Sequence, residues 1–262
     1  MVRTILITGA TDGIGELTAK MLAAKGHKVL LHGRNAAKLA GVAAEIGGDT
    51  ESYIADLSDM NQVEAMAAQV LEKHTRLDVL INNAGVLKAP NTCTAAGLDL
   101  RFVVNTLAPY VLTKLLLPII PESGRVVNVS SAAQAPVDVL AMAGPGEMND
   151  MAAYSQSKLA MNIWSRELAK ELPEGPVVVA VNPGSLLASK MVKEGFGVAG
   201  NDLKIGADIL CAAALDDSFA DATGKYFDND SGRFKDPNPA ALDPKHAQEV
   251  MQKINELVAA FG

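Results

Sequence analysis

The stretch that decides the fold is TILITGATDGIGELTAK, residues 4–20. An unbroken apolar run leads directly into a turn with three glycines, and a helical pattern follows. This order is typical of the start of a dinucleotide-binding βαβ unit, because the glycines let the backbone approach a pyrophosphate and the helix N-terminus meets its charge. The spacing is GxxxGxG rather than the more familiar GxGxxG, so a purely structural turn is the alternative.

The rest of the chain repeats this alternation of strand and helix. Apolar and β-branched runs predict strands at residues 3–8, 28–32, 50–55, 79–82, 125–130, 177–182 and 225–228. Apolar residues at three- and four-residue steps predict helices at residues 14–25, 36–46, 60–74, 98–117, 153–172 and 245–260. We therefore expect an α/β fold, a Rossmann-type doubly wound parallel sheet of about seven strands with helices on both faces.

Two stretches interrupt this rhythm. Residues 135–150 and 185–202 lack a clear period, and we expect both to be loops, the second with room for a short helix. Residues 229–244 are rich in Pro and Asp, and no repeat or interdomain linker is visible. Since α/β chains of 262 residues commonly form one domain, we expect residues 1–262 to be a single dinucleotide-binding and catalytic domain.

Composition argues against several classes of protein. The formal net charge is −7 with scattered Lys and Arg, so binding to nucleic acid is not expected. No apolar run reaches the roughly 18 residues of a membrane span, and the N-terminus leaves no room for a signal peptide. Cys93 and Cys211 lie far apart without CxxC spacing, which predicts neither a disulfide framework nor a metal site and suits a reducing cytoplasm.

The glycine turn and the end of the second strand predict the cofactor. The turn residues expected to contact it are Gly9, Thr11, Asp12, Gly13, Ile14 and Gly15. An NAD-preferring site would carry an acidic residue after the second strand, but this chain has Gly33-Arg34 there. A guanidinium can grip a 2′-phosphate with two hydrogen bonds. We predict NADP(H) as the preferred cofactor and NAD(H) as a possible one; alternatively, Arg34 is simply an exposed residue at a helix start. His32 is expected to be a strand-end residue rather than a ligand.

Three later strands also end in polar clusters. These clusters are Asn82-Asn83-Ala84-Gly85, Ser130-Ser131 and Asn182-Pro183-Gly184. Any one of them could be polar only because the chain leaves the core there. In an open parallel sheet, however, ligands bind outside the carboxyl ends of the strands, so together with the glycine turn these clusters predict a lined cleft.

The predicted helix after the first long loop carries Tyr154 and Lys158. Residues four apart share one face of a helix, and a nearby ammonium favours the phenolate form of tyrosine. The pair would bring the phenol into a useful range for acid–base chemistry at neutral pH. On its own, a YxxxK pattern more often marks an exposed helix surface than an active site.

Taken together, these motifs resemble the short-chain dehydrogenase/reductase family. The shared features are TGxxxGIG at residues 8–15, NNAG at 82–85, a serine at 131, YxxxK at 154–158 and NPG at 182–184, in the family's order over nearly the whole chain. The segments AAYSQSKLAMNIWSREL and GKYFDND look most like the branch that contains retinol dehydrogenases and similar NADPH-linked reductases.

The resemblance implies a catalytic tetrad of Asn105, Ser131, Tyr154 and Lys158. Tyr154 would be the acid or base, Ser131 would hydrogen-bond the reacting oxygen, and Lys158 would lower the tyrosine pKa and hold the nicotinamide ribose. Asn105 would position a water linked to the lysine. The family pattern selects Ser131 over Ser130.

The resemblance also implies further cofactor contacts. Asp56 and Leu57 would meet the adenine, and the backbone from Pro183 to Leu187 would face the carboxamide. The full set outside the turn is Arg34, Asp56, Leu57, Asn83, Ala84, Gly85, Tyr154, Lys158, Pro183, Gly184, Leu186 and Ser189. This chain departs from the pattern at Asp12, where NADP-preferring members often carry a basic residue, and at Ser189, which replaces a threonine only approximately. The interval from Ser131 to Tyr154 is also longer than in the commonest members.

We therefore expect an NADP(H)-dependent oxidoreductase that transfers hydride between nicotinamide and a ketone, aldehyde or secondary alcohol. The pocket loops favour an uncharged, fairly apolar substrate. The family implies a homodimer or homotetramer formed through helix faces. Two alternatives stay open: a non-redox enzyme on the same fold, such as a dehydratase or epimerase, and a catalytically silent nucleotide-sensing protein, against which the complete tetrad argues.

Overall fold

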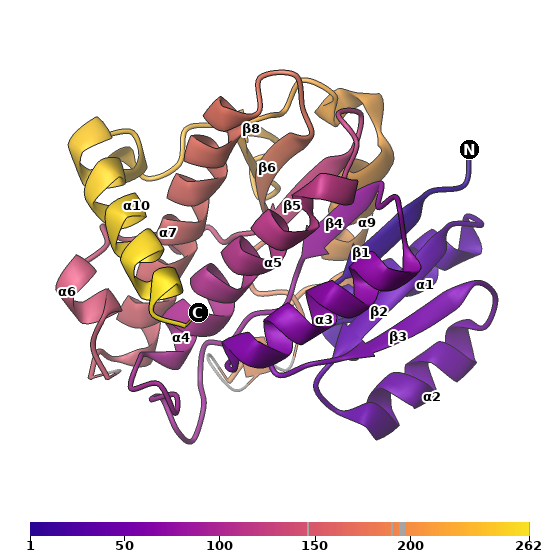
Figure 1. The fold of residues 1–262 in the computed structure, drawn as a ribbon, viewed down its shortest axis with the longest axis horizontal. Helices are drawn as coiled ribbons and strands as arrows, with labels where there is room; N and C mark the ends of the chain where they lie inside the picture. The colour runs from indigo at the N-terminus through magenta and orange to yellow at the C-terminus, as the bar shows by residue number, and fades with distance from the viewer. Residues whose placement is uncertain (146, 190, 194–196, 262) are drawn as a thin grey trace.

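An eight-stranded sheet forms the centre of the molecule (Figure 1). The computed structural model describes residues 1–145, 147–189, 191–193 and 197–261. The strands are β1 Thr4–Ile7, β2 Lys28–Gly33, β3 Thr50–Ile54, β4 Val79–Asn82, β5 Arg125–Val129, β6 Val177–Asn182, β7 Tyr226–Asp228 and β8 Arg233–Lys235. Their order across the sheet is β3-β2-β1-β4-β5-β6-β7-β8, and every neighbouring pair except β7 and β8 is parallel. The predicted Rossmann-type doubly wound fold is confirmed.

Helices cover both faces of this sheet. They are α1 Gly13–Ala24, α2 Ala36–Ile46, α3 Met60–Lys73, α4 Leu100–Phe102, α5 Ala108–Leu116, α6 Val139–Met142, α7 Asp150–Glu171, α9 Leu203–Leu215 and α10 Pro244–Ala259. A π-helical turn at Val103–Leu107 joins α4 to α5, and short 3-10 turns lie at Leu117–Ile119, Asp217–Phe219 and Pro239–Ala241.

Alternate strand residues feed two separate hydrophobic cores. Leu6, Leu30 and Leu80 pack on the side of α3, α5, α7 and α10, whereas Ile7 and Ile81 pack on the side of α1, α2 and α9. Because side chains alternate across a strand, a strand buried on both faces must be apolar at every position. This is why these runs are continuous rather than alternating in the sequence.

The structure differs from the predicted elements in several places. The sheet has eight strands rather than about seven, since β8 adds an antiparallel edge strand within the Pro- and Asp-rich segment. Helix α9 is not among the expected elements, α6 lies within the expected loop at 135–150, and the helix expected at 98–117 contains the π-helical turn. Helix α7 begins at Asp150 rather than 153, because the Asn149 side chain caps the amide of Ala152. Positions 146, 190 and 194–196 of the two expected loops lie outside the described residues.

One helical stretch meets the length and composition of a membrane span, which the sequence had not been expected to contain. In the described part of the chain it is Leu100–Ile119, with 20 residues and a mean hydropathy of 1.5. Of its apolar stretch, 67% is buried inside the molecule, and Phe102, Leu107 and Leu112 have no exposed surface. A core helix passes the same test, so this stretch is weak evidence for a membrane.

Candidate active site

The predicted site residues gather at one edge of the sheet. Strands β1, β4, β5 and β6 are neighbours in the sheet and parallel, so their carboxyl ends meet at the same edge. The glycine turn, Asn83, Ser131 and Pro183 each follow one of these four strands. Residues more than 170 positions apart in the sequence, such as Gly9 and Pro183, therefore lie along one rim.

The glycine turn is packed tightly against the end of β4. Gly9 has a φ of +67°, which L side chains rarely adopt. A Cβ on Gly15 would collide with the Asn83 side chain and the Gly9 carbonyl oxygen. The Asn83 amide group donates to Thr8 O at 2.8 Å, and the Thr8 hydroxyl accepts the backbone N–H groups of Asn83 and Ala84, both at 3.0 Å. The Asn83 side chain is thus used to hold the turn.

The N-terminus of α1 is open toward solvent. Asp12 precedes the helix in an extended conformation, is exposed, and makes no side-chain hydrogen bond to the first turn. The first amides of the helix are therefore left without a side-chain cap, as at an anion-binding helix start. A Cβ built on Gly13 would lie 3.7 Å from the Cβ of Ser189. Ser189, in the segment after β6, therefore lies beside the glycine turn.

His32 has a structural role that the sequence did not reveal. The Gly9 N–H donates to Nδ1 of His32 at 3.2 Å, and Nε2 lies 3.0 Å from Ala55 O. Since Nδ1 accepts, Nε2 must carry the proton, and burial lowers the pKa of His32 and keeps the ring neutral. The ring ties the glycine turn to the end of β3, consistent with a strand-end residue that is not a ligand.

Of the three residues predicted to contact the adenosine half of the cofactor, two have exposed surface. Arg34 is exposed, Asp56 is partly exposed and Leu57 is buried. The Asp56 carboxylate accepts from the Ser58 hydroxyl at 2.7 Å and from its backbone N–H at 2.9 Å. A Cβ on Gly33 would lie 2.5 Å from the Thr11 methyl group, so Gly33 lets Thr11 lie against the end of β2.

Tyr154, Lys158 and Ser131 come together over the end of β5. The Ser131 side chain lies close enough to the Tyr154 phenol to lower its pKa, whereas the Ser130 hydroxyl is turned toward Lys158 O, 3.5 Å away. The Lys158 ammonium lies 5.7 Å from the centre of the Tyr154 ring and donates to Val129 O at 2.7 Å. The second serine of the pair is therefore the one beside the phenol.

Burial controls the titration of this pair. The pKa of Tyr154 is raised by burial, with the Ser131 hydrogen bond opposing the change. Burial lowers the pKa of Lys158 to about 8. Burial penalises the charged forms of both groups, and the role of Lys158 in lowering the tyrosine pKa stays a prediction.

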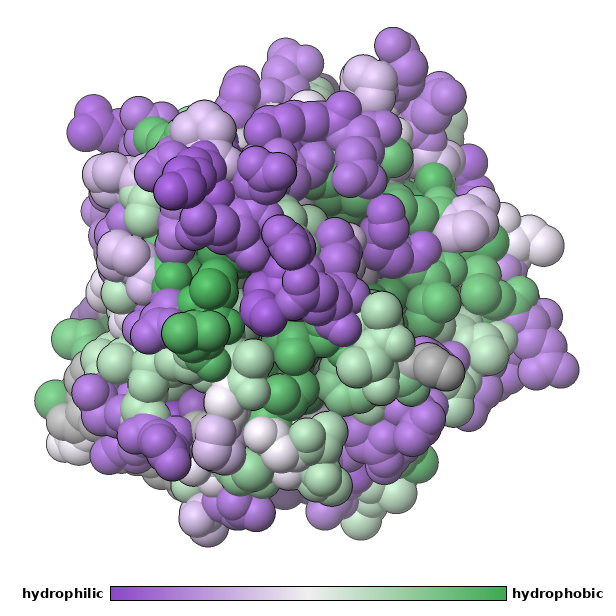
Figure 2. Space-filling view, turned by 60° about the vertical axis from the view of Figure 1, so that its left-hand side comes forward, coloured by the Kyte–Doolittle hydropathy of each residue, from purple (hydrophilic) through white to green (hydrophobic). Residues whose placement is uncertain are grey.

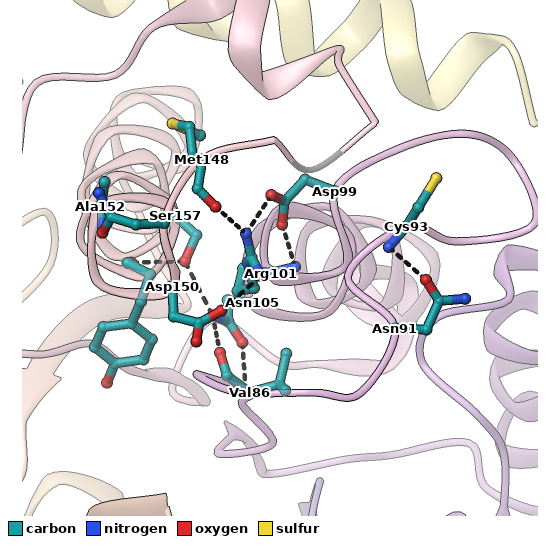
Figure 3. Close-up of polar contacts among 12 residues, drawn as sticks. Val86, Asn91, Cys93, Asp99, Arg101, Asn105, Met148, Asp150, Ala152 and Ser157 are labelled. Carbon is teal, nitrogen blue, oxygen red and sulfur yellow. Dashed lines mark hydrogen bonds and ion pairs between the residues drawn. The ribbon is translucent and has the colours of Figure 1, made fainter. Parts of the chain in front are cut away.

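Asn105 lies inside the π-helical turn between α4 and α5 and is fully buried (Figure 3). Its Nδ2 donates to Val86 O and to the Ser157 hydroxyl, both at 2.9 Å, and its Oδ1 accepts the Val86 N–H at 2.8 Å. The Ser157 hydroxyl in turn donates to Tyr154 O at 2.7 Å. The turn therefore couples the loop after β4 to the helix that carries Tyr154; π-helical turns are frequent at functional sites.

Arg101 forms a second link to the same helix, which sequence reasoning missed. Its guanidinium is fully buried and contacts Asp99 at 2.8 Å, Met148 O at 3.1 Å and Asp150 at 3.1 Å (Figure 3). Asp150 is the first residue of α7, one turn before Tyr154. A lone arginine inside an apolar helical stretch is the only sequence signal for this link, since its partner Asp150 lies 49 residues away.

The edge is suited to a nicotinamide dinucleotide. Gly9 and Gly15 let the turn pack closely on the end of β4, and the helix start behind the turn has no side-chain cap that would compete with a pyrophosphate. Among the described residues, no group of three or more His, Cys, Asp or Glu could hold a metal ion. Fold and site together define a dinucleotide-binding α/β protein.

Comparison with known proteins identifies the family. The model of the short chain dehydrogenase family matches residues 3–196. The human protein retinol dehydrogenase 13 is 31% identical over 98% of this chain and 84% of its own length. A protein of Mycobacterium paratuberculosis superposes with a TM-score of 0.81 at 29% identity, covering 98% of this chain and 93% of its own. A short chain dehydrogenase of Shigella flexneri complexed with NADP superposes with a TM-score of 0.70 at 29% identity, covering 87% and 97%.

The chain belongs to the short-chain dehydrogenase family and is similar to the retinol dehydrogenases within it. It is an NAD(P)-dependent oxidoreductase that acts on alcohol or carbonyl groups.

Proposed function

We propose that this protein is an NADP(H)-dependent reductase or dehydrogenase that interconverts an uncharged, apolar ketone or aldehyde and its alcohol. The observation that carries the proposal is the convergence of Tyr154, Ser131 and Lys158 at the sheet edge that also holds the glycine turn. We propose that residues 1–262 act as one catalytic domain, because both hydrophobic cores pack on the same sheet.

The preference for NADP(H) rests on the end of β2. Arg34 is exposed there, and Gly33 beside it offers no carboxylate that would repel a 2′-phosphate. The similar Shigella flexneri dehydrogenase is complexed with NADP. Asp12 at the start of α1 works against a phosphate, so NAD(H) is proposed as the weaker alternative cofactor.

The protein's own side chains would handle the proton. A bound nicotinamide supplies or accepts the hydride. In the reductive direction, the Tyr154 hydroxyl donates its proton to the substrate oxygen, and the Ser131 hydroxyl orients that oxygen. The raised pKa of Tyr154 keeps the phenol protonated at neutral pH, which suits the acid role. Lys158 would hold the nicotinamide ribose, and Asn105 holds the loop after β4 through its two bonds to Val86.

An apolar substrate is favoured by exposed hydrophobic residues in the segments that follow β5 and β6. Leu140 in α6 and Met151 in the first turn of α7 lie between Ser131 and Tyr154 in the sequence, and Leu186 follows the NPG motif. All three are exposed large hydrophobic residues. Figure 2 shows hydrophobic side chains reaching the surface between hydrophilic ones. Exposed apolar side chains on these segments would suit an apolar ligand.

The predicted homodimer or homotetramer and the cytoplasmic location remain predictions. Helix α10 lies along α7 (Figure 1) and buries Val250 and Ile254 in the same core as Trp164. The Tyr110 hydroxyl of α5 donates to Asn255 of α10 at 3.0 Å. The outer surfaces of α5 and α7 are therefore partly covered, and an assembly would need to include α10 in its interface.

The proposed function is tested by a spectrophotometric assay of purified protein with ketones, aldehydes and secondary alcohols and with each cofactor. We expect turnover with NADPH to exceed turnover with NADH. In Tyr154→Phe, turnover should fall about 10²- to 10⁴-fold, because a general acid is lost, while NADPH binding stays nearly intact. Comparable turnover in the variant would refute the role of Tyr154.

The same assay separates the alternatives. A dehydratase or epimerase would convert substrate without net change in nicotinamide absorbance, and a nucleotide sensor would bind cofactor without turnover. Ser130→Ala is the matched control for Ser131→Ala, because Ser131 acts on the Tyr154 phenol whereas the Ser130 hydroxyl faces Lys158 O. We expect Ser131→Ala to lower kcat much more than Ser130→Ala does.

A further inference from the structure

The segment after β6 is held from outside by the turn between β7 and β8. The Asn229 side chain donates to Pro183 O at 2.9 Å. The Asp230 carboxylate accepts the Ser185 N–H at 2.8 Å and the Ser185 hydroxyl at 2.6 Å. A short turn near the end of the chain thus bonds to two consecutive parts of the NPG segment, residues 182–185.

Buried groups anchor this turn. Asn182 and Asp228 are almost fully buried, and Asn182 Nδ2 donates both to Asp228 at 2.7 Å and to Asp230 at 2.9 Å. Ser231 and Lys235 complete the bonds to Asp228 at 2.7 and 2.9 Å. Burial acts to raise the pKa of Asp228, but these hydrogen bonds outweigh it and hold the pKa at about 2, so the carboxylate stays ionised at neutral pH.

Within the turn between β7 and β8, Asp230 makes more hydrogen bonds to residues 182–185 than Asn229 does. Its carboxylate accepts three hydrogen bonds, two from Ser185 and one from Asn182. The backbone directly after residues 182–185 is unusual, since Leu186, which is not glycine, has a φ of +51°. Such conformations persist only where neighbouring contacts hold them.

We propose that Asp230 is a positioning residue that holds the backbone of residues 182–185 in the conformation that receives the nicotinamide half of the cofactor. The inference rests on the proposed function, because it assumes that this segment faces the carboxamide. Asp230 acts only through Ser185 and Asn182. Loss of its carboxylate should therefore weaken the grip on the nicotinamide and leave the grip on the adenosine half unchanged.

The test compares two ligands. NADPH carries the nicotinamide, whereas 2′-phospho-ADP-ribose lacks it, so the ratio of their dissociation constants measures the contribution of the nicotinamide. We expect this ratio to favour NADPH in the native protein and to fall about five- to tenfold in Asp230→Ala, the loss typical of charge-assisted hydrogen bonds near the surface. Asp230→Asn should lie between the two, because its Oδ1 still accepts the Ser185 N–H.

Asp236→Ala is the matched control, since Asp236 is an exposed carboxylate that follows β8 in the same tail. It should leave the ratio unchanged. A native ratio near one, or a ratio in Asp230→Ala within twofold of the native ratio, would overturn the proposal. A merely misfolded variant would lose both ligands equally, which also counts against positioning. A native protein that binds neither ligand would instead contradict the proposed function.

Discussion

The two ends of the sheet edge that carries the candidate site are built in opposite ways. Around Tyr154, the side chains of Asn105, Lys158 and Arg101 are buried and joined by hydrogen bonds to distant segments. Around Arg34, Asp12 and Arg34 itself are exposed, and Asp56 bonds only to its near neighbours. A change at the first end should therefore disturb folding and chemistry together, whereas a change at the second should alter ligand preference alone.

The largest effect on stability is expected at Arg101. Arg101→Met would leave the Asp99 carboxylate fully buried without its cation, and removal of one partner of a buried ion pair typically costs about 3–5 kcal/mol. We expect a loss of this size in the free energy of unfolding, measured with urea, together with lower activity because α7 loses a contact at its first turn.

Two further variants sharpen this prediction. The pair Arg101→Met/Asp99→Asn removes the unpaired charge and should recover part of the lost stability. Asp150→Asn affects only a partner whose side chain is 38% exposed, so it should cost less than about 1 kcal/mol. Equal losses of unfolding free energy in Arg101→Met and Asp150→Asn would show that the buried pair of Arg101 and Asp99 does not determine the stability.

A smaller effect is expected from the titration of Lys158. Its pKa in the folded protein is about 8, below the ordinary value, so the unfolded chain binds more protons between the two values. The free energy of unfolding contributed by Lys158 therefore rises with pH across that window. Between about pH 7.5 and 9.5, the native protein should gain about 2 kcal/mol relative to Lys158→Met.

Lys245→Met is the control for this measurement, because the Lys245 side chain is 85% exposed. The difference in unfolding free energy between this variant and the native protein should not change over the same pH range. A flat difference for Lys158→Met as well would show that the ammonium is not desolvated in the folded protein.

The sequence predicts those features whose signals are local. The apolar strands, the glycine turn and the pair Tyr154 and Lys158 depend on spacing within one element, and their positions in the fold follow from the parallel sheet. Helix α9 was missed because Gly206 interrupts its helical pattern. The structure needs that glycine, since a Cβ there would lie 2.6 Å from Leu187 and 3.2 Å from Ile14.

Long-range contacts account for the remaining omissions. Asp230 and Ser185 are 45 residues apart, and nothing in either local pattern indicates the other. The edge strand β8 has only three residues and depends on pairing with β7. The π-helical turn at Asn105 has no sequence signature of its own. The sequence therefore predicted the candidate side chains better than the contacts that position them.

The smallest effect is expected at Arg34, at the exposed end of the sheet edge. Arg34→Asp replaces the proposed phosphate ligand with a carboxylate that can accept a ribose 2′-hydroxyl. We expect the NADPH/NADH ratio of kcat/KM to fall at least about tenfold, equivalent to about 1.4 kcal/mol, with no loss of stability because Arg34 is exposed. Lys25→Asp makes the same charge change at an exposed position after α1 and should leave the ratio unaltered. If both variants shift the ratio equally, net charge rather than a specific contact with Arg34 sets the preference, and an unchanged ratio in Arg34→Asp would remove the basis for preferring NADP(H).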